Sequence, residues 1–111
     1  MLPRLETRTR PHVWKEWARL TGEEEHGTVA RTRIFDHYHL TIEAVLNGLG
    51  AAIVPWHLVT GDIECGRLVA PYGFLQSEYR YVVKVERPGR RKAEHFIGWL
   101  RDAIAEFPAP P

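Results

Sequence analysis

The feature that most constrains the fold is a wholly apolar run at residues 51–54 (Ala-Ala-Ile-Val), placed directly after a glycine-rich helix end. A short strand that is apolar on both sides is typical of a parallel sheet covered by helices on both faces. Gly48-Leu49-Gly50 just before it matches part of a dinucleotide-binding fingerprint. That fingerprint needs a strand before the glycines and a helix after them, and the order here is the reverse. The glycines therefore predict the end of a helix.

Helical and strand patterns alternate along the rest of the chain. Apolar residues three or four apart predict helices, and β-branched residues that alternate with charged ones predict half-buried strands. The predicted strands are residues 4–7, 28–35, 51–54, 67–70 and 79–86. The predicted helices run from Thr9 or Arg10, with Pro11 in the first turn, to Gly22; from a cap at Asp36 through 38–49; from Pro55 to Gly61 or Gly66; and over 92–107. This alternation indicates an α/β fold with a mostly parallel sheet.

Charge and composition limit the partners. The 111 residues include 15 Lys and Arg against 14 Asp and Glu, and the formal net charge is +1. A chain that binds DNA itself normally carries a basic excess, so we expect DNA contact to lie outside this chain. Cys65 is the single cysteine, which fits a reducing compartment. The first residues lack the apolar core of a signal peptide, and no apolar run is long enough to span a membrane. We therefore expect a cytoplasmic domain without a membrane partner.

The patterns that could carry chemistry are all weak. Asp36, His37 and His39 could be imagined as metal ligands, but residues two apart on a helix do not share a face. A second cluster with ligand spacing is not found in the sequence. Ser77 and Cys65 have no base nearby in the pattern that activates a nucleophile. We therefore expect no enzyme activity, no metal and no cofactor.

Two further patterns have an ordinary structural explanation. Residues 23–26 (Glu-Glu-Glu-His) could hold a cation, but such a charge run is typical of a solvated loop. Four tryptophans could form a stacking platform for a nucleic acid or a sugar, namely Trp14, Trp17, Trp56 and Trp99. The helical spacing of the first two and the apolar stripe beside the last favour packing in a core or an interface.

The order of the motifs is more specific than any one of them. Residues 35–55 combine a helix, a Gly-x-Gly turn and a small apolar strand that ends in proline. Residues 66–72 (Gly-Arg-Leu-Val-Ala-Pro-Tyr), the aromatic strand at 79–83 and a closing helix with Phe96 and Trp99 follow in turn. This succession, which covers nearly the whole chain, resembles the effector-binding domain of LysR-type transcriptional regulators.

The resemblance implies a three-layer α/β fold and one lobe of a type-2 periplasmic-binding-protein-like domain, with a small-molecule effector held between two lobes. It assigns residues 1–78 to the second lobe, 79–107 to a strand and helix that return to a first lobe, and 108–111 to a tail. The first lobe and a winged helix-turn-helix domain that contacts DNA would lie outside this chain. The expected function is effector binding that controls DNA binding by that separate domain. The alternatives are a lobe of a solute-binding protein and a truncated oligomerisation module.

The resemblance also implies where the effector-facing wall of this lobe lies. Ligands of open α/β sheets bind beyond the carboxyl ends of the strands. The ends of the strands at 4–7 and 28–35 and the segments that follow three of the strands contain the candidate contacts Thr7, Arg8, Thr9, Phe35, Asp36, His37, Tyr38, Pro55 and Trp56. Structural roles compete at two of them, because Asp36 is equally a candidate helix cap and Tyr38 a candidate core residue. His37 and Arg8 beside a helix N-terminus favour an acidic effector.

The closing helix predicts an oligomer. Its stripe is too apolar to face water, with Phe96, Ile97, Leu100, Ile104 and Phe107 on one side. The resemblance implies that this stripe packs on the first lobe. In this chain the strand and helix either return onto the chain's own sheet or exchange with a second copy. We expect the exchange, a domain-swapped dimer with a hinge at residues 73–78.

Overall fold

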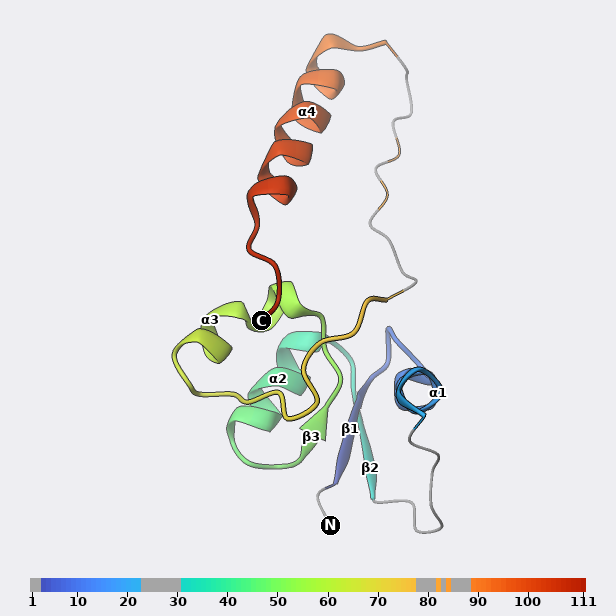
Figure 1. The fold of residues 1–111 in the computed structure, drawn as a ribbon. Coiled ribbons are helices and arrows are strands. Elements are labelled where there is room, and N and C mark those ends of the chain that lie inside the picture. The colour runs from blue at the N-terminus through green and yellow to red at the C-terminus, as the bar shows by residue number, and fades with distance from the viewer. Residues whose placement is uncertain (1–2, 23–30, 78–81, 83, 85–88) are drawn as a thin grey trace. The chain divides into compact units, whose positions relative to one another are not determined.

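The computed structural model describes residues 3–22, 31–77, 82, 84 and 89–111. The chain forms two compact units, Met1–Pro71 and Tyr72–Pro111. The described residues form three strands and three helices in the first unit and one helix in the second (Figure 1). In chain order the elements are β1 (Arg4–Thr7), α1 (Val13–Thr21), β2 (Thr32–Phe35), α2 (Tyr38–Leu46), β3 (Ala51–Ala52), α3 (Trp56–Glu64) and α4 (Arg91–Glu106).

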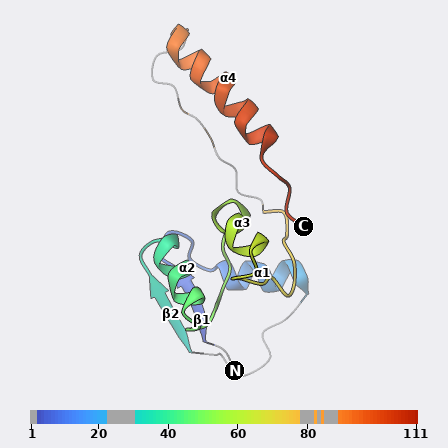
Figure 2. The ribbon, with the colours of Figure 1, turned by 90° about the vertical axis from the view of Figure 1, so that its left-hand side faces the viewer.

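The three strands of the first unit form a parallel sheet in the order β2-β1-β3. The chain crosses from β1 out to β2 and then back past β1 to β3. Because crossovers between parallel strands are right-handed, two crossovers in opposite directions place their helices on opposite faces. Figure 1 shows α1 and α2 on opposite sides of the strands, and Figure 2 views the unit from the side of α2 and α3. The predicted α/β fold with helices on both faces of a parallel sheet is confirmed.

The turn between α2 and β3 follows from its glycines. Gly48 has φ +77°, and the backbone N–H groups of Gly48 and Leu49 donate to the carbonyls of Val45 and Ala44. This pair of hydrogen bonds is a Schellman motif, which closes a helix on a left-handed residue that glycine adopts without strain. Gly50 is required for a different reason, since a Cβ there would collide with the Pro3 carbonyl at the start of β1. The glycines thus end α2 and let β3 approach β1 closely, as predicted.

A small core lies on the two faces of this sheet. Its buried apolar side chains are Leu5, Val13, Ile42, Ala44 and Val59. On one face α2 packs against all three strands. On the other face the Trp14 indole N–H of α1 donates to the Leu5 carbonyl of β1 at 3.1 Å. Trp14 also lies edge-on to Trp17, with 6.0 Å between ring centroids, and carries the Arg4 guanidinium 4.9 Å above its own ring. These contacts give Trp14 the packing role that the sequence favoured.

Two of the predicted boundaries that differ from the structure are the start of α1 and the end of β3. Helix α1 begins at Val13 and not at Thr9 or Arg10, because the Arg10 N–H donates to the Thr7 carbonyl and turns the chain first. Pro11 therefore precedes the helix. Strand β3 ends at Ala52, two residues earlier than predicted.

The predicted strand at residues 67–70 is wrong. These residues form bends and irregular backbone after α3. The Leu68 N–H donates to the carbonyl of Asp62, and the Arg67 guanidinium lies 2.9 Å from the Asp62 carboxylate. Both contacts hold the segment against the end of α3 and away from the edge of the sheet. The end of α3 itself agrees with the second predicted stop, since Gly66 has φ +81° just after it.

The second unit is dominated by α4, whose bounds agree with the predicted helix at residues 92–107 to within one residue. The predicted strand at residues 79–86 lies almost wholly outside the described residues, and Val82 and Lys84 are not in a strand. Within the described part of the chain, no helix is long and apolar enough to cross a membrane. The assignment of residues 79–107 to another lobe stays a prediction.

Candidate functional site

The carboxyl ends of the three parallel strands meet at one edge of the sheet. Thr7, the last residue of β1, pairs with Phe35, the last residue of β2, and β3 runs parallel to them on the other side of β1. The candidate contacts occupy the ends of β1 and β2 and the segments that follow all three strands. The topology therefore brings together at this carboxyl edge residues from 7 to 56, which are far apart in the sequence.

Thr7 does not face solvent. Its side chain is 2% exposed, and its hydroxyl lies 2.7 Å from the hydroxyl of Thr41, which is fully buried on α2. This hydrogen bond joins the last residue of β1 to the first turns of α2. Thr7 therefore fixes the position of α2 at the carboxyl edge. Thr41 was not among the candidate contacts predicted from the sequence. Thr41 precedes Ile42, which is buried on the face of α2 that packs on the sheet. A hydroxyl next to a core position needs a buried hydrogen-bond partner, and this is the signal that could have identified Thr41.

Arg8 and Asp36 join the loops that leave β1 and β2. The Arg8 Nε lies 2.8 Å from the Asp36 Oδ1, and the Arg8 backbone N–H donates to the Phe35 carbonyl at 2.8 Å. Both side chains are largely exposed. Asp36 therefore does not cap α2. The N-cap is His37, which has an extended backbone and whose carbonyl accepts from the N–H groups of Leu40 and Thr41.

All three helices that follow these strands begin without a side-chain cap from a described residue. Their N-caps are His12 for α1, His37 for α2 and Pro55 for α3. The first N–H groups of a helix have no partner inside the helix, and their aligned dipoles give that end a partial positive charge. Together with the Arg8 guanidinium, these helix starts favour an anionic group at the edge. The Asp36 carboxylate already neutralises part of this positive charge through its ion pair with Arg8.

The remaining candidates lie around the helix starts. Thr9 and His37 are exposed, and Phe35, Tyr38, Pro55 and Trp56 are half-buried. The rings of His37 and His39 stack with 5.6 Å between centroids. Among the described residues, no three His, Cys, Asp or Glu side chains gather in a way that could hold a metal ion.

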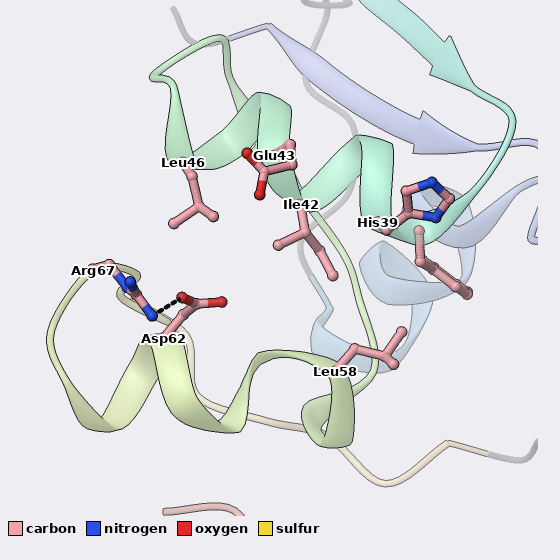
Figure 3. A pocket seen from close by; sticks show the side chains of 8 residues that line it. His39, Ile42, Glu43, Leu46, Leu58, Asp62 and Arg67 are labelled. Atoms are coloured by element: carbon pink, nitrogen blue, oxygen red, sulfur yellow. Dashed lines mark ion pairs between the residues drawn. The ribbon is translucent and has the colours of Figure 1, made fainter.

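A hollow of about 580 Å³ lies between α2 and α3, and Tyr38 is the only candidate residue that lines it. Figure 3 shows Ile42 and Leu46 from α2 opposite Leu58 from α3. The ion pair of Asp62 with Arg67 lies at the end of the hollow near Leu46. This hollow was not predicted from the sequence, because it depends on how two helices pack, which no local pattern reveals. Arg8, Thr9 and Asp36 do not line it.

The comparisons with known proteins agree with the resemblance. A model of the LysR substrate binding domain matches residues 4–105. The HTH-type transcriptional regulator TrpI of Pseudomonas aeruginosa is 36% identical over 106 residues, which are 93% of this chain and 35% of that protein. The HTH-type transcriptional regulator DsdC of Escherichia coli is 35% identical over 75 residues, 63% of this chain and 24% of that protein. No solved structure gives a significant match.

The chain thus spans about a third or less of the curated relatives that it matches. The matched family is one of binding domains and not of enzymes, which confirms the expectation that this chain is not an enzyme.

Proposed function

Because the chain belongs to the LysR substrate-binding-domain family, we propose that it binds a small-molecule effector at the carboxyl edge of its sheet and thereby controls DNA binding by a separate winged helix-turn-helix domain. This domain lies outside the chain, and a first lobe supplies the opposite wall of the effector cleft. The regulator acts in the cytoplasm. The formal net charge of this chain is only +1. This supports the proposal that the chain binds the effector and that another domain contacts DNA.

The observation that carries the proposal is the convergence at the carboxyl edge. Three parallel strands end there, and three helices begin just beyond them. Ligands of open α/β sheets bind in this position, because the strand ends and the helix starts present backbone groups that no secondary structure uses. The nine candidate contacts are retained on this ground, with Thr7 acting from within the core.

The effector carries a carboxylate or another anionic group. Arg8 is held over the edge by Asp36, and an exposed ion pair of this kind contributes only about 0.2–1 kcal/mol, so an incoming anion can take over the guanidinium at little cost. The uncapped first turns of α2 and α3 supply further N–H donors. His37, exposed at the start of α2, adds a side-chain donor to the same place.

A thermal-shift comparison on the full-length regulator tests this proposal. Small carboxylates are screened against the matching neutral amides, since a ligand that binds only the folded protein raises its melting temperature. Arg8→Gln should weaken a carboxylate hit about 10- to 100-fold, the value of a charged hydrogen bond. Arg67→Gln is the matched control, because Arg67 is equally exposed and also holds a single carboxylate, but lies beside the hollow. Amides that bind as well as carboxylates, with a normal response of Arg8→Gln, would contradict the anionic assignment.

A further inference from the structure

Two ion pairs lie in the connections that leave the strands at the carboxyl edge. Arg8, just after β1, holds Asp36, just after β2, with 2.8 Å between Nε and Oδ1. Arg10 and Glu16, farther along the connection from β1 into α1, form a second pair with 3.7 Å between Nη2 and Oε2. All four residues belong to the first unit. Each of the two guanidinium groups therefore has a carboxylate beside it.

The backbone keeps Arg8 and Asp36 close together. Thr7 and Phe35 are partners at the end of the ladder between β1 and β2, and the Arg8 N–H donates to the Phe35 carbonyl at 2.8 Å. Asp36 follows Phe35 directly, so neither charged residue can move far from the other without breaking this end of the ladder. Both side chains are open to solvent, 73% exposed for Arg8 and 64% for Asp36. A ligand can therefore reach two opposite charges that the sheet holds as neighbours.

A ligand with a carboxylate alone removes the ion-pair partner of Asp36. When such a ligand binds the Arg8 guanidinium, two carboxylates share one cation, and like charges held close together oppose binding. Asp36 does not regain a partner by capping α2, since the N-cap position is one residue later, at His37. The pair thus penalises a ligand that carries only a negative charge.

An ammonium group beside the carboxylate of the ligand removes this conflict. The ligand carboxylate accepts from the Arg8 guanidinium, and the ligand ammonium donates to the Asp36 carboxylate. Hydrogen bonds between two charged groups are the strong ones, and here both charges of the pair gain such a bond. The net charge at the edge stays the same when the ligand binds. α-Amino acids carry the two required groups on a single carbon.

We propose that the effector is a zwitterion of the α-amino acid type, with its carboxylate on Arg8 and its ammonium group on Asp36. Asp36 is then the residue that selects amino acids over simple carboxylates. This inference rests on the effector site proposed above for the carboxyl edge, and it names the class of ligand that the site takes.

Matched ligands test the proposal. The full-length regulator is screened by thermal shift against the common α-amino acids at millimolar concentration, because a ligand that binds only the folded protein raises its melting temperature. For each amino acid that binds, titration calorimetry compares the matching acid without the amino group and the matching amino amide. Each of these should bind about 10- to 100-fold more weakly than the amino acid, since each lacks one charged hydrogen bond.

Asp36→Asn should reverse this selectivity. It should weaken the amino acid about 10- to 100-fold through the lost charged hydrogen bond. It should tighten the acid without the amino group about 2- to 5-fold, because an exposed ion pair no longer competes for Arg8. Asp62→Asn is the control, since it removes a carboxylate from an ion pair of nearly the same length, 2.9 Å to Arg67, and Asp62 is not a candidate contact. This control should change neither affinity.

The outcomes separate this inference from the proposed function. Equal affinity for the amino acid and the acid without the amino group, with both weakened by Arg8→Gln, would overturn the zwitterion and leave the anion site standing. Tighter binding of both ligands by Asp36→Asn would show that Asp36 only competes with the effector, and would overturn the inference as well. It is also wrong if no α-amino acid raises the melting temperature. Normal binding of every ligand by Arg8→Gln would contradict the proposed site itself.

Discussion

Thr41→Val removes one partner of the buried hydrogen bond that fastens α2 to the end of β1. The two hydroxyls are 2.7 Å apart, Thr7 is 2% exposed, and Thr41 is fully buried. After the substitution water cannot replace the lost partner of Thr7 without opening the core. A buried polar group left without a partner costs about 1–3 kcal/mol, and we expect Thr41→Val to lower the free energy of unfolding by that amount. In a domain of this size, 1 kcal/mol corresponds to a melting shift of about 4–8 °C.

The double variant Thr7→Val, Thr41→Val makes the prediction specific to the hydrogen bond. Valine has nearly the shape of threonine, and replacing both partners by apolar groups leaves no unsatisfied group. The double variant should therefore recover much of the stability that each single variant loses. Urea unfolding followed by circular dichroism at 222 nm measures the three variants, with a coupling energy of about 1–2 kcal/mol expected for groups in direct contact. Losses that simply add in the double variant would refute the argument that the two hydroxyls act as a pair.

Three further predictions concern the sheet, the edge and the partner. Gly50→Ala should lower the free energy of unfolding by about 1–3 kcal/mol because its Cβ collides with the Pro3 carbonyl; Gly61→Ala, in open space on α3, should instead raise it by about 0.5–1 kcal/mol in the same urea titration. His37→Ala in the full-length regulator should weaken effector binding while stability changes by less than about 0.5 kcal/mol, because His37 is exposed; a large fall in melting temperature with unchanged affinity would make it structural. The 111-residue chain should shift duplex DNA in a mobility assay no more than a neutral control protein does, and salt-sensitive binding would contradict this.

The elements that the sequence predicted well are those with strong local signals. The bounds of β1 agree with the prediction, and those of α4 differ from it by one residue at each end. The turn at Gly48 and the stop at Gly66 followed from glycine's tolerance of positive φ, and both residues adopt it. Each of these signals lies within a few residues of the structure that it determines, so no distant contact was needed to recognise it.

The errors occurred where the structure depends on which partner a residue contacts. Residues 67–70 have strand-like composition, but the ion pair of Arg67 with Asp62 and the hydrogen bond of Leu68 to Asp62 hold them beside α3. Asp36 has the side chain of a good helix cap, but Arg8, 28 positions earlier in the chain, takes its carboxylate. The sequence could nominate both residues as candidates, but it could not say which of several partners each one would meet.

The candidate site shows the same division. The carboxyl edge was predictable, because parallel strands joined by helices place their ends together and a familiar order of motifs identified which strands these are. The burial of Thr7 was not predictable, because it depends on a hydroxyl 34 residues away. The hollow between α2 and α3 was not predictable either, since it depends on how far apart two helices pack.

Hydrogen–deuterium exchange on the full-length regulator, with and without a ligand found by the thermal-shift screen, tests most directly whether the carboxyl edge binds the effector. The account predicts that the ligand slows exchange in the segments around Arg8 and Thr9, around Asp36 and His37, and around Trp56. Peptides around Glu43 and Asp62, which line the hollow but are not candidate contacts, should exchange at the same rate in both states. Protection confined to the hollow, with no change at the three strand ends, would contradict the account.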